Sequence, residues 1–280
     1  MSTATVGQLL QAASNRIDRL DAEILLGHVL HQTRAWLFAH VNDKIEAQHA
    51  QDLENLVSRR AAGEPCALIR GNQDFWTLTL TVSTATLIPR ADTELLVELA
   101  LELPGDNLVV LDAGTGSGAI AAAVASERPG WQVFASDSSA AALAVAMHNC
   151  GPRVPMWQTN WLDPVASDAL DIVISNPPYI EEGDPHLDAL AFEPRTALTA
   201  GADGLDALRT LISEARRVLK SGGTLILEHG WQQGPAVRGL FQAAQYTDIA
   251  THHDLAGRER ATMAHWYRPP RANRSAQRRG

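Results

Sequence analysis

The sequence has few of the residues that mark a secreted, metal-binding or membrane protein. Its 280 residues include only two cysteines, Cys66 and Cys150, and neither has a partner at a zinc-binding spacing. Reduced thiols of this kind are typical of a cytoplasmic protein. No apolar run approaches the length that spans a membrane, and residues 1–5 lack the basic and apolar regions of a signal peptide. We therefore expect a cytoplasmic location and no membrane partner.

Positive charge is also scarce. The chain has 23 lysines and arginines against 32 aspartates and glutamates, for a formal net charge of −9 at pH 7. Binding along a phosphate backbone normally needs a basic face, so we expect no stable nucleic-acid partner. Several arginines do lie in residues 269–280. There we predict a flexible basic tail, with a contact to an acidic partner or RNA as the alternative.

Apolar residues make up 45% of the chain, and their period changes near residue 70. Residues 1–71 carry them at helical spacing, with Asp21 and Thr33 as candidate N-caps, which predicts a small helical domain. That domain either only packs or docks a partner protein. Residues 76–82 then alternate apolar residues with threonines, which is the period of a strand. We place the linker between the domains at 72–90.

Short apolar strands alternate with helices from residue 108 onward. This pattern predicts an α/β domain with a parallel, doubly wound sheet, because buried parallel strands are continuous apolar runs and each crossover needs a helix. The strands are expected at 108–112, 132–137, 156–159, 171–175 and 224–228, with two more near 248–252 and 262–267. The helices are expected at 119–127, 140–149, 205–220 and 232–244.

A glycine-rich loop follows the first strand of this sheet. It consists of Gly114, Thr115, Gly116, Ser117 and Gly118. Its backbone can approach a ligand closely, and the next helix directs its N–H groups there. Asp137 ends the second strand, where a carboxylate can accept from both ribose hydroxyls. The loop predicts a nucleoside-containing cofactor, and because its spacing also fits the dinucleotide fingerprint, NAD stays an alternative. The third glycine and Asp112 before the loop favour S-adenosylmethionine.

The fourth strand ends abruptly in Asn176, Pro177, Pro178 and Tyr179. Neither proline has a backbone N–H, so the chain must leave the sheet there. The side-chain oxygen of Asn176 and the carbonyl of Pro177 are expected to accept the two N–H bonds of a planar group, on which Tyr179 stacks. Opposite a methyl donor, this clamp suits N-methylation of an amide or an exocyclic amine. It places negative potential where positive charge develops and aims the attacking nitrogen.

Motifs over nearly the whole chain resemble the peptide-chain release factor glutamine methyltransferase family, part of the Asn-Pro-Pro-Tyr class of Rossmann-like methyltransferases. The resemblance rests on the segments 60–65, 71–76, 87–94, 111–118, 175–180, 192–198, 227–231 and 258–260. Within these, Ile-Pro-Arg-x-Asp-Thr-Glu at 88–94 and Phe-Glu-Pro-Arg at 192–195 single out the family. The Asn-Pro-Pro-Tyr motif itself is shared with amino-group DNA methyltransferases.

The resemblance implies the domain plan, the cofactor and the substrate. It implies a helical N-terminal domain over 1–71 that docks the substrate protein, a β-hairpin linker over 72–90 and a seven-stranded methyltransferase domain over 91–268. S-adenosylmethionine would donate the methyl group and leave as S-adenosylhomocysteine. The acceptor would be the glutamine amide in the Gly-Gly-Gln motif of class-1 release factors, with an effect on translation termination. We expect the enzyme to be a monomer.

The resemblance also assigns roles to residues. The cofactor would be bound by the loop 114–118 together with Asp137, Asn160, Trp161 and Asn176, and the glutamine by residues 176–179. Catalysis would rest on Asn176, Pro177 and Tyr179. Trp161 would cover the adenine. The family usually has an aspartate where this chain has Asn160, whose oxygen can still accept from the adenine amine but carries no charge.

Other functions are weighed against this one. A ribosomal-protein glutamine methyltransferase would use the same chemistry on another partner. A DNA amino-methyltransferase would need a target-recognition region and a basic face, which the sequence does not indicate. A ribosome-binding module without catalysis would have a damaged loop or clamp. Glu193 and Arg195, in a loop expected at 180–204, form either a structural salt bridge or part of the site's closure, and residues 228–230 are expected to support the site at most.

Overall fold

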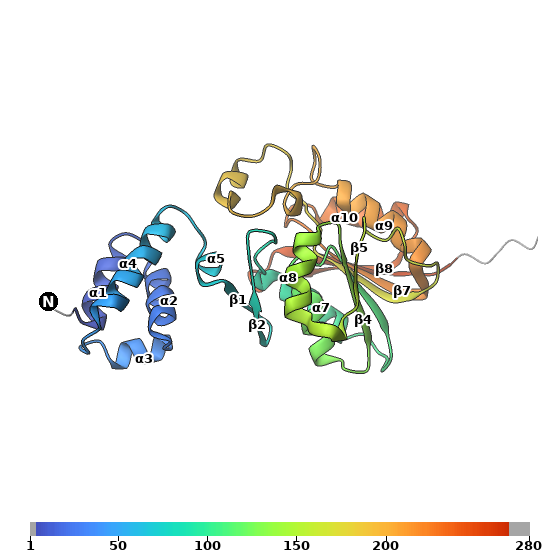
Figure 1. Ribbon diagram of the computed structural model, residues 1–280. Coiled ribbons are helices and arrows are strands. Elements are labelled where there is room, and N and C mark those ends of the chain that lie inside the picture. Colours follow the sequence, from blue (N-terminus) through green and yellow to red (C-terminus); the bar gives the residue numbers. More distant parts are fainter. Residues whose placement is uncertain (1–3, 269–280) are drawn as a thin grey trace, which may run out of the picture.

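The computed structural model describes residues 4–268, and the predicted basic tail at 269–280 lies outside them. A helical N-terminal unit stands apart from a larger α/β unit, with a short hairpin between them (Figure 1). The N-terminal unit contains α1 (Val6–Ser14), α2 (Arg19–Leu30), α3 (Arg34–Ala39) and α4 (Ala47–Ala61), and α5 (Cys66–Arg70) leads into the hairpin. This arrangement confirms the predicted fold class.

Local capping sets where the first helices begin. Thr33 caps α3 as predicted, because its side chain accepts from the backbone N–H of Trp36. The prediction that Asp21 caps α2 is wrong, since Asp18 does so by accepting from the N–H of Leu20. The helix starts one turn earlier than the apolar pattern indicated. Asp21 lies in its first turn and pairs with Arg60 of α4 at 2.6 Å.

The linker is a two-stranded antiparallel hairpin of β1 (Asn72–Phe75) and β2 (Leu78–Thr81). The alternating residues 76–82 predicted one strand that starts at Trp76, whereas Trp76 lies in the turn with φ of 56°. Two hydrogen bonds of Trp76 explain the difference. Its indole N–H donates to Glu127 at 2.7 Å, and its backbone N–H donates to Glu94 at 2.7 Å. The turn is therefore anchored to two helices of the α/β unit.

The α/β unit is built on a seven-stranded sheet in the order β5-β4-β3-β6-β7-β9-β8. All strands are parallel except β9, which is antiparallel to both neighbours. The strands are β3 (Val109–Ala113), β4 (Gln132–Asp137), β5 (Met156–Gln158), β6 (Leu170–Ser175), β7 (Leu219–Glu228), β8 (Thr247–His253) and β9 (Glu259–Trp266). The helices are α6 (Glu94–Leu101), α7 (Ala119–Glu127), α8 (Ala140–Cys150), α9 (Asp206–Val218) and α10 (Gly234–Ala243), with 3₁₀ turns at η1 (Ala91–Thr93), η2 (Gly151–Arg153), η3 (Pro185–Leu190) and η4 (Arg195–Ala197).

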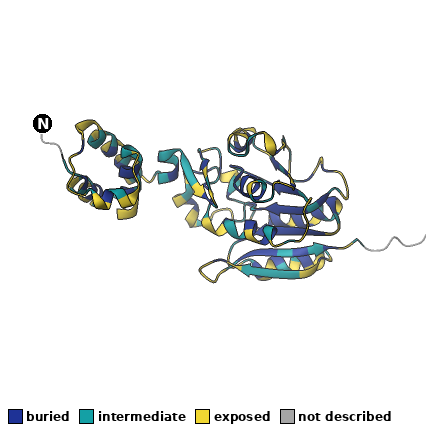
Figure 2. Ribbon diagram, turned by 90° about the horizontal axis from the view of Figure 1, so that it is seen from below, coloured by how far each residue is buried: buried dark blue, intermediate teal, exposed yellow. Residues whose placement is uncertain are grey.

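Two cores lie on opposite faces of this sheet, and alternate strand residues supply them. Val110 and Ile172 belong to the core that contains α6 and α7, whereas Leu111 and Val173 belong to the core that contains α9 and α10. Figure 2 shows the central strands as a buried interior layer, whereas the edge strands β5 and β8 are only partly buried. Because both faces are covered, the strands read as continuous apolar runs, which made the sheet predictable.

Candidate active site

A pocket lies at the carboxyl ends of β3, β4 and β6, where the strand order reverses. Much of its lining comes from the glycine loop, the end of the linker, the turn after β6 and the segment 194–197. The pocket brings together most of the residues predicted for the site: Gly114, Thr115, Gly116, Ser117, Asp137, Asn160, Trp161, Asn176 and Pro178. Gly118, Pro177 and Tyr179 are not among the lining residues.

The glycine loop turns its backbone toward this pocket. Gly114 donates its N–H to the carbonyl of Ser136 at 2.8 Å, which fixes the loop to β4. Gly116 has a positive φ of 56°, and a Cβ added there would meet no atom within 4 Å. A Cβ on Gly118 would instead lie 2.8 Å from the sulfur of Cys150. Gly116 therefore leaves room for a ligand, whereas Gly118 allows the loop to pack on α8.

Trp161 and Asp137 border the loop. A Cβ on Gly114 would lie 3.0 Å from the Trp161 ring, so the indole rests directly on the loop backbone. Trp161 has φ of 44°, a region that bulky residues rarely adopt. The Asp137 carboxylate accepts from the N–H of Gly116 at 2.9 Å and from the N–H of Ser139 at 2.8 Å. These bonds fix the carboxylate at the pocket wall.

A buried acid lies behind the loop. One Asp112 oxygen accepts from the Thr115 hydroxyl at 2.5 Å and from the N–H of Ala121 at 3.2 Å. The other oxygen is buried and has no hydrogen-bond partner among residues 4–268. Burial raises the pKa of Asp112 to about 7. An unpaired buried carboxylate is costly, so this position favours positive charge nearby.

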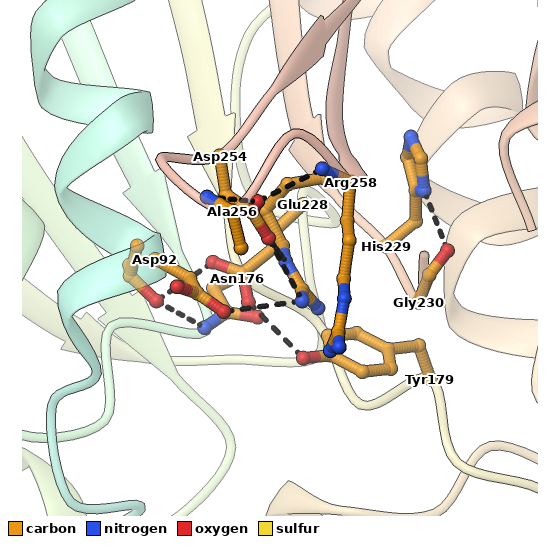
Figure 3. Close-up of polar contacts among 11 residues, drawn as sticks. Asp92, Asn176, Tyr179, Glu228, His229, Gly230, Asp254, Ala256 and Arg258 are labelled. Atoms are coloured by element: carbon orange, nitrogen blue, oxygen red, sulfur yellow. Dashed lines mark hydrogen bonds and ion pairs between the residues drawn. The ribbon is translucent and has the colours of Figure 1, made fainter. Parts of the chain in front are cut away.

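A chain of hydrogen bonds starts at the turn after β6. The Asn176 amide nitrogen donates to the hydroxyl of Thr93 at 3.0 Å. That hydroxyl donates to one oxygen of Glu228 at 2.7 Å, and the Tyr179 hydroxyl donates to the other at 3.1 Å. Figure 3 shows Asn176, Glu228 and Tyr179 converging from different strands and turns. No residue in the described part of the chain donates to the side-chain oxygen of Asn176.

Glu228 is the centre of this chain. Its exposed fraction is 1%, and burial raises its pKa to about 7. The guanidinium of Arg260 lowers that pKa in part, and it pairs with Asp92 at 3.1 Å and Asp254 at 3.3 Å. Burial likewise raises the pKa of Tyr179, whose ring packs against the core beside α9.

Sequence comparisons identify relatives over both units. The model described as "PrmC N-terminal domain" matches residues 4–71, and the model "Methyltransferase small domain" matches residues 90–193. A release factor glutamine methyltransferase of Xylella fastidiosa is 49% identical over 263 residues, which cover 91% of this chain and 96% of that protein. The chain belongs to the release factor glutamine methyltransferase family.

Further members of this release factor glutamine methyltransferase family come from other bacteria. The Escherichia coli K12 protein is 43% identical over 92% of this chain and 95% of its own length. The Coxiella burnetii protein is 42% identical over 94% of this chain and 97% of its own length. Among solved structures, a methyltransferase from Pyrococcus furiosus has a TM-score of 0.54 at 16% identity and covers 77% of this chain and 100% of that chain. That likeness concerns the fold.

The pocket of this methyltransferase fits S-adenosylmethionine, the methyl donor that the family and the fold imply. The open backbone at Gly116 leaves space for a ligand, and the Asp137 carboxylate faces that space. Asp112 lies behind the loop and is not among the residues that line the pocket. Among residues 4–268 there is no cluster of metal-ligating side chains, and no helix there is long and apolar enough to cross a membrane.

Glu193 lies beside the methyltransferase pocket, whose lining includes its neighbour Pro194 but not Glu193 itself. One carboxylate oxygen accepts from the N–H of Ile88 at 2.8 Å, and the other pairs with Arg90 at 2.5 Å. Glu193 therefore forms a salt bridge, but with Arg90 rather than with Arg195, and this pair joins the segment 192–195 to the linker end. The next residue, Pro194, lines the pocket, whereas Arg195 is exposed. The segments that single out the family thus meet across the pocket.

Thr93 was absent from the predicted site residues, and Glu228 was expected only to support the site. Thr93 lies within the family segment 88–94, and this is the one feature of the sequence that could have placed Thr93 in the site. No spacing in the sequence connects Thr93 with Asn176, because the two are 83 residues apart and meet only through the packing of η1 on the sheet edge.

Proposed function

We propose that this enzyme transfers a methyl group from S-adenosylmethionine to the side-chain amide nitrogen of the glutamine in the Gly-Gly-Gln motif of class-1 release factors. Its membership in the release factor glutamine methyltransferase family supports the assignment of this glutamine as the methyl acceptor. The observation that carries the chemistry is the Asn176 amide at the pocket wall. Its nitrogen is held by Thr93, so its oxygen is left to accept an N–H from a substrate.

The cofactor is assigned to the end of the pocket beside the glycine loop. When bound, S-adenosylmethionine supplies an electrophilic methyl group on a sulfonium. We propose that the backbone of 114–118 contacts this cofactor. The Asp137 carboxylate would bind its ribose hydroxyls, and Trp161 and Asn160 would bind its adenine. The rigid attachment of the loop to β4 and α8 supports this, because a preformed site loses little entropy on binding.

The amide clamp explains how a poor nucleophile reacts. The glutamine nitrogen lone pair is delocalised into the carbonyl, so it attacks only when it is aimed and when developing positive charge is stabilised. The Asn176 oxygen and the Pro177 carbonyl would accept the two N–H bonds of the glutamine nitrogen. These bonds would both aim the nitrogen and stabilise its developing positive charge. The methylated nitrogen is acidic and loses a proton to solvent, so the clamp needs no general base.

Tyr179 has a supporting place in this proposal. Its hydroxyl is bound to Glu228, and its carbonyl accepts from the side chain of Gln233 at 3.0 Å. Both bonds hold the turn that carries Asn176. Stacking of the Tyr179 ring on the glutamine amide stays a prediction, as do the monomeric state, the cytoplasmic location and the lack of a stable nucleic-acid partner. Product S-adenosylhomocysteine would leave by the same pocket.

A labelling experiment tests the proposed function. Release factor with an intact Gly-Gly-Gln motif, and a matched factor with that glutamine changed to alanine, are incubated with enzyme and methyl-labelled S-adenosylmethionine. We expect label only in the intact factor, on one glutamine by mass spectrometry. Equal labelling of both factors, or of neither, would contradict the assignment.

A further inference from the structure

We propose that Thr93 and Glu228 are positioning residues that hold the Asn176 amide in one orientation, with its oxygen toward the pocket. Through that orientation they determine that the pocket receives the N–H side of an acceptor amide. This inference rests on the proposed function and names residues that act through Asn176.

The polarity of the hydrogen-bond chain carries the argument. An ionised Glu228 has no hydrogen to donate, so the Thr93 hydroxyl must donate to it, as the 2.7 Å contact shows. The lone pair left on the Thr93 oxygen can then only accept. Asn176 must therefore turn its NH₂ group toward Thr93, at 3.0 Å, which directs its oxygen away. Tyr179 donates to the second oxygen of Glu228 and keeps the carboxylate from rotating.

Because this chain of hydrogen bonds is buried, it determines the orientation of the Asn176 amide. Thr93 is 4% exposed and Glu228 is 1% exposed, so water has little access to replace a missing partner. The guanidinium of Arg260 favours the ionised form of Glu228, and it also pairs at 3.1 Å with Asp92, the residue before Thr93. The family segment 88–94 thus places a hydroxyl between the turn after β6 and the end of β7.

Reversal of the Asn176 amide would change what the pocket binds. Its NH₂ group would then face the acceptor and pair with the carbonyl oxygen of the glutamine amide. The glutamine nitrogen would point away from the methyl donor, and the charge-stabilising acceptor would be lost. Sites built from buried hydrogen-bonding groups discriminate strongly against a partner of the wrong polarity.

Threonine variants test the inference. Thr93→Val keeps the shape of the side chain and removes the hydroxyl, and Thr93→Ser keeps the hydroxyl. Thr224→Val is the matched control, because Thr224 is also buried, bonds one side chain (His265, at 3.0 Å) and lies on β7 away from the pocket. We expect Thr93→Val to lower kcat for a release factor by about tenfold or more, with KM for S-adenosylmethionine nearly unchanged. Thr93→Ser should recover most of the rate, and Thr224→Val should match the wild type.

The pH dependence of kcat for Glu228→Gln is a second test. If Glu228 had only a structural role, the ratio of wild-type to variant kcat would not change with pH. Protonated Glu228 can donate to Thr93, whose hydrogen is then free to bond the Asn176 oxygen, so both amide orientations become available. Wild-type kcat should therefore fall as pH decreases below about 7. A glutamine donates at every pH, so the ratio of wild-type to variant kcat should shrink from pH 8 to pH 6. The charged and titratable groups that face Glu228 are Tyr179, Arg260 and Asp92, and the variant keeps them all.

The outcomes separate this inference from the proposed function. Wild-type enzyme that fails to methylate the factor would refute the proposed function. Wild-type enzyme that is active, with Thr93→Val at an equal rate, would refute the positioning role alone. A Thr93→Val enzyme that loses binding of S-adenosylmethionine together with kcat and is not rescued by serine would also refute it, as would a constant kcat ratio for Glu228→Gln across the pH range.

Discussion

Single residues at the turn after β6 determine the chemistry that we propose. Asn176 combines a fixed nitrogen with a free oxygen at the pocket wall. Asn176→Ala should lower kcat by roughly 10²-fold or more, because it removes an acceptor aimed at charge that develops during methyl transfer. The rate is measured with saturating S-adenosylmethionine and release factor. Asn107→Ala is the control, because Asn107 is exposed and precedes β3 at the sheet edge opposite the pocket. An unchanged rate in Asn176→Ala would remove the clamp from the mechanism.

Glu228 also links the site to the stability of the fold. Burial raises its pKa from 4.5 to about 7, so between these values the folded protein binds a proton that the unfolded chain releases. Its contribution to stability is present below pH 4.5 and is lost as pH rises through 7. The free energy of unfolding should fall by about 1.4 kcal/mol per pH unit in that window from this group.

Glu228→Gln should remove that contribution. Urea unfolding at pH 5 and pH 7.5 measures it, and the variant is expected to lose less stability than the wild type over this interval. Asp112 stays as a second buried acid in both proteins, so it cancels in the comparison. Identical pH dependence in the two proteins would show that Glu228 titrates normally.

At the level of elements, one side chain of α8 joins the linker hairpin to the glycine loop. The Asn149 amide nitrogen donates to the carbonyl of Thr81 at 2.9 Å and to the carbonyl of Ser117 at 2.8 Å. Its oxygen accepts from the N–H of Thr81 at 2.9 Å. The hairpin and the cofactor loop are therefore held by the same residue.

Asn149→Ala should weaken binding of S-adenosylmethionine about tenfold, because hydrogen bonds that fix the loop are lost. We expect kcat at saturating cofactor to change little, since the clamp is on the other side of the pocket. Isothermal titration with S-adenosylhomocysteine gives the dissociation constant, and His148→Ala, the exposed neighbour on α8, is the control. Equal affinity in wild type and Asn149→Ala would show that the loop is preformed without this contact.

The same scale shows what the sequence could predict. β4 and α7 have the predicted ends, because each is a short apolar run or a helical repeat between clear boundaries. β7 starts at Leu219 rather than 224, because Leu219 pairs with Leu170 of β6, and Gly223, which resembles a turn residue, pairs with Trp266 of β9. Such pairing depends on a strand more than forty residues away. The local sequence pattern therefore cannot predict this pairing.

The candidate site divides in the same way. Residues that end a strand or directly follow one, such as Asp137 and Asn176, were predictable because the carboxyl ends of neighbouring parallel strands meet at one edge. Thr93 and Asn149 were missed because they reach the site through packing between distant segments. Glu193 lies 103 residues from Arg90, and only the folded loop brings them together.

At the level of the whole molecule, the helical unit is separate from the pocket, since every lining residue lies at position 85 or later. The hairpin connects the two units, and α5 packs on it through the small cluster of Ala67, Val82 and Ile88. A ring atom of Phe192, in the loop beside the pocket, would lie 3.6 Å from a Cβ on Gly63 at the end of the helical unit. The end of the helical unit therefore lies against the loop beside the pocket, although the unit contributes no lining residue.

This arrangement predicts that the enzyme distinguishes a protein from a peptide. A complete release factor should be methylated with a kcat/KM at least about 100-fold above that of a short Gly-Gly-Gln peptide, with similar kcat, because remote contacts add binding energy without changing the reacting groups. Hydrogen exchange locates those contacts: amides of α1–α4 should exchange more slowly with the factor than with the peptide. The glycine loop serves as the internal control, since S-adenosylhomocysteine should protect it in both cases. Equal kcat/KM for protein and peptide, or unchanged exchange in α1–α4, would rule out docking by the helical unit.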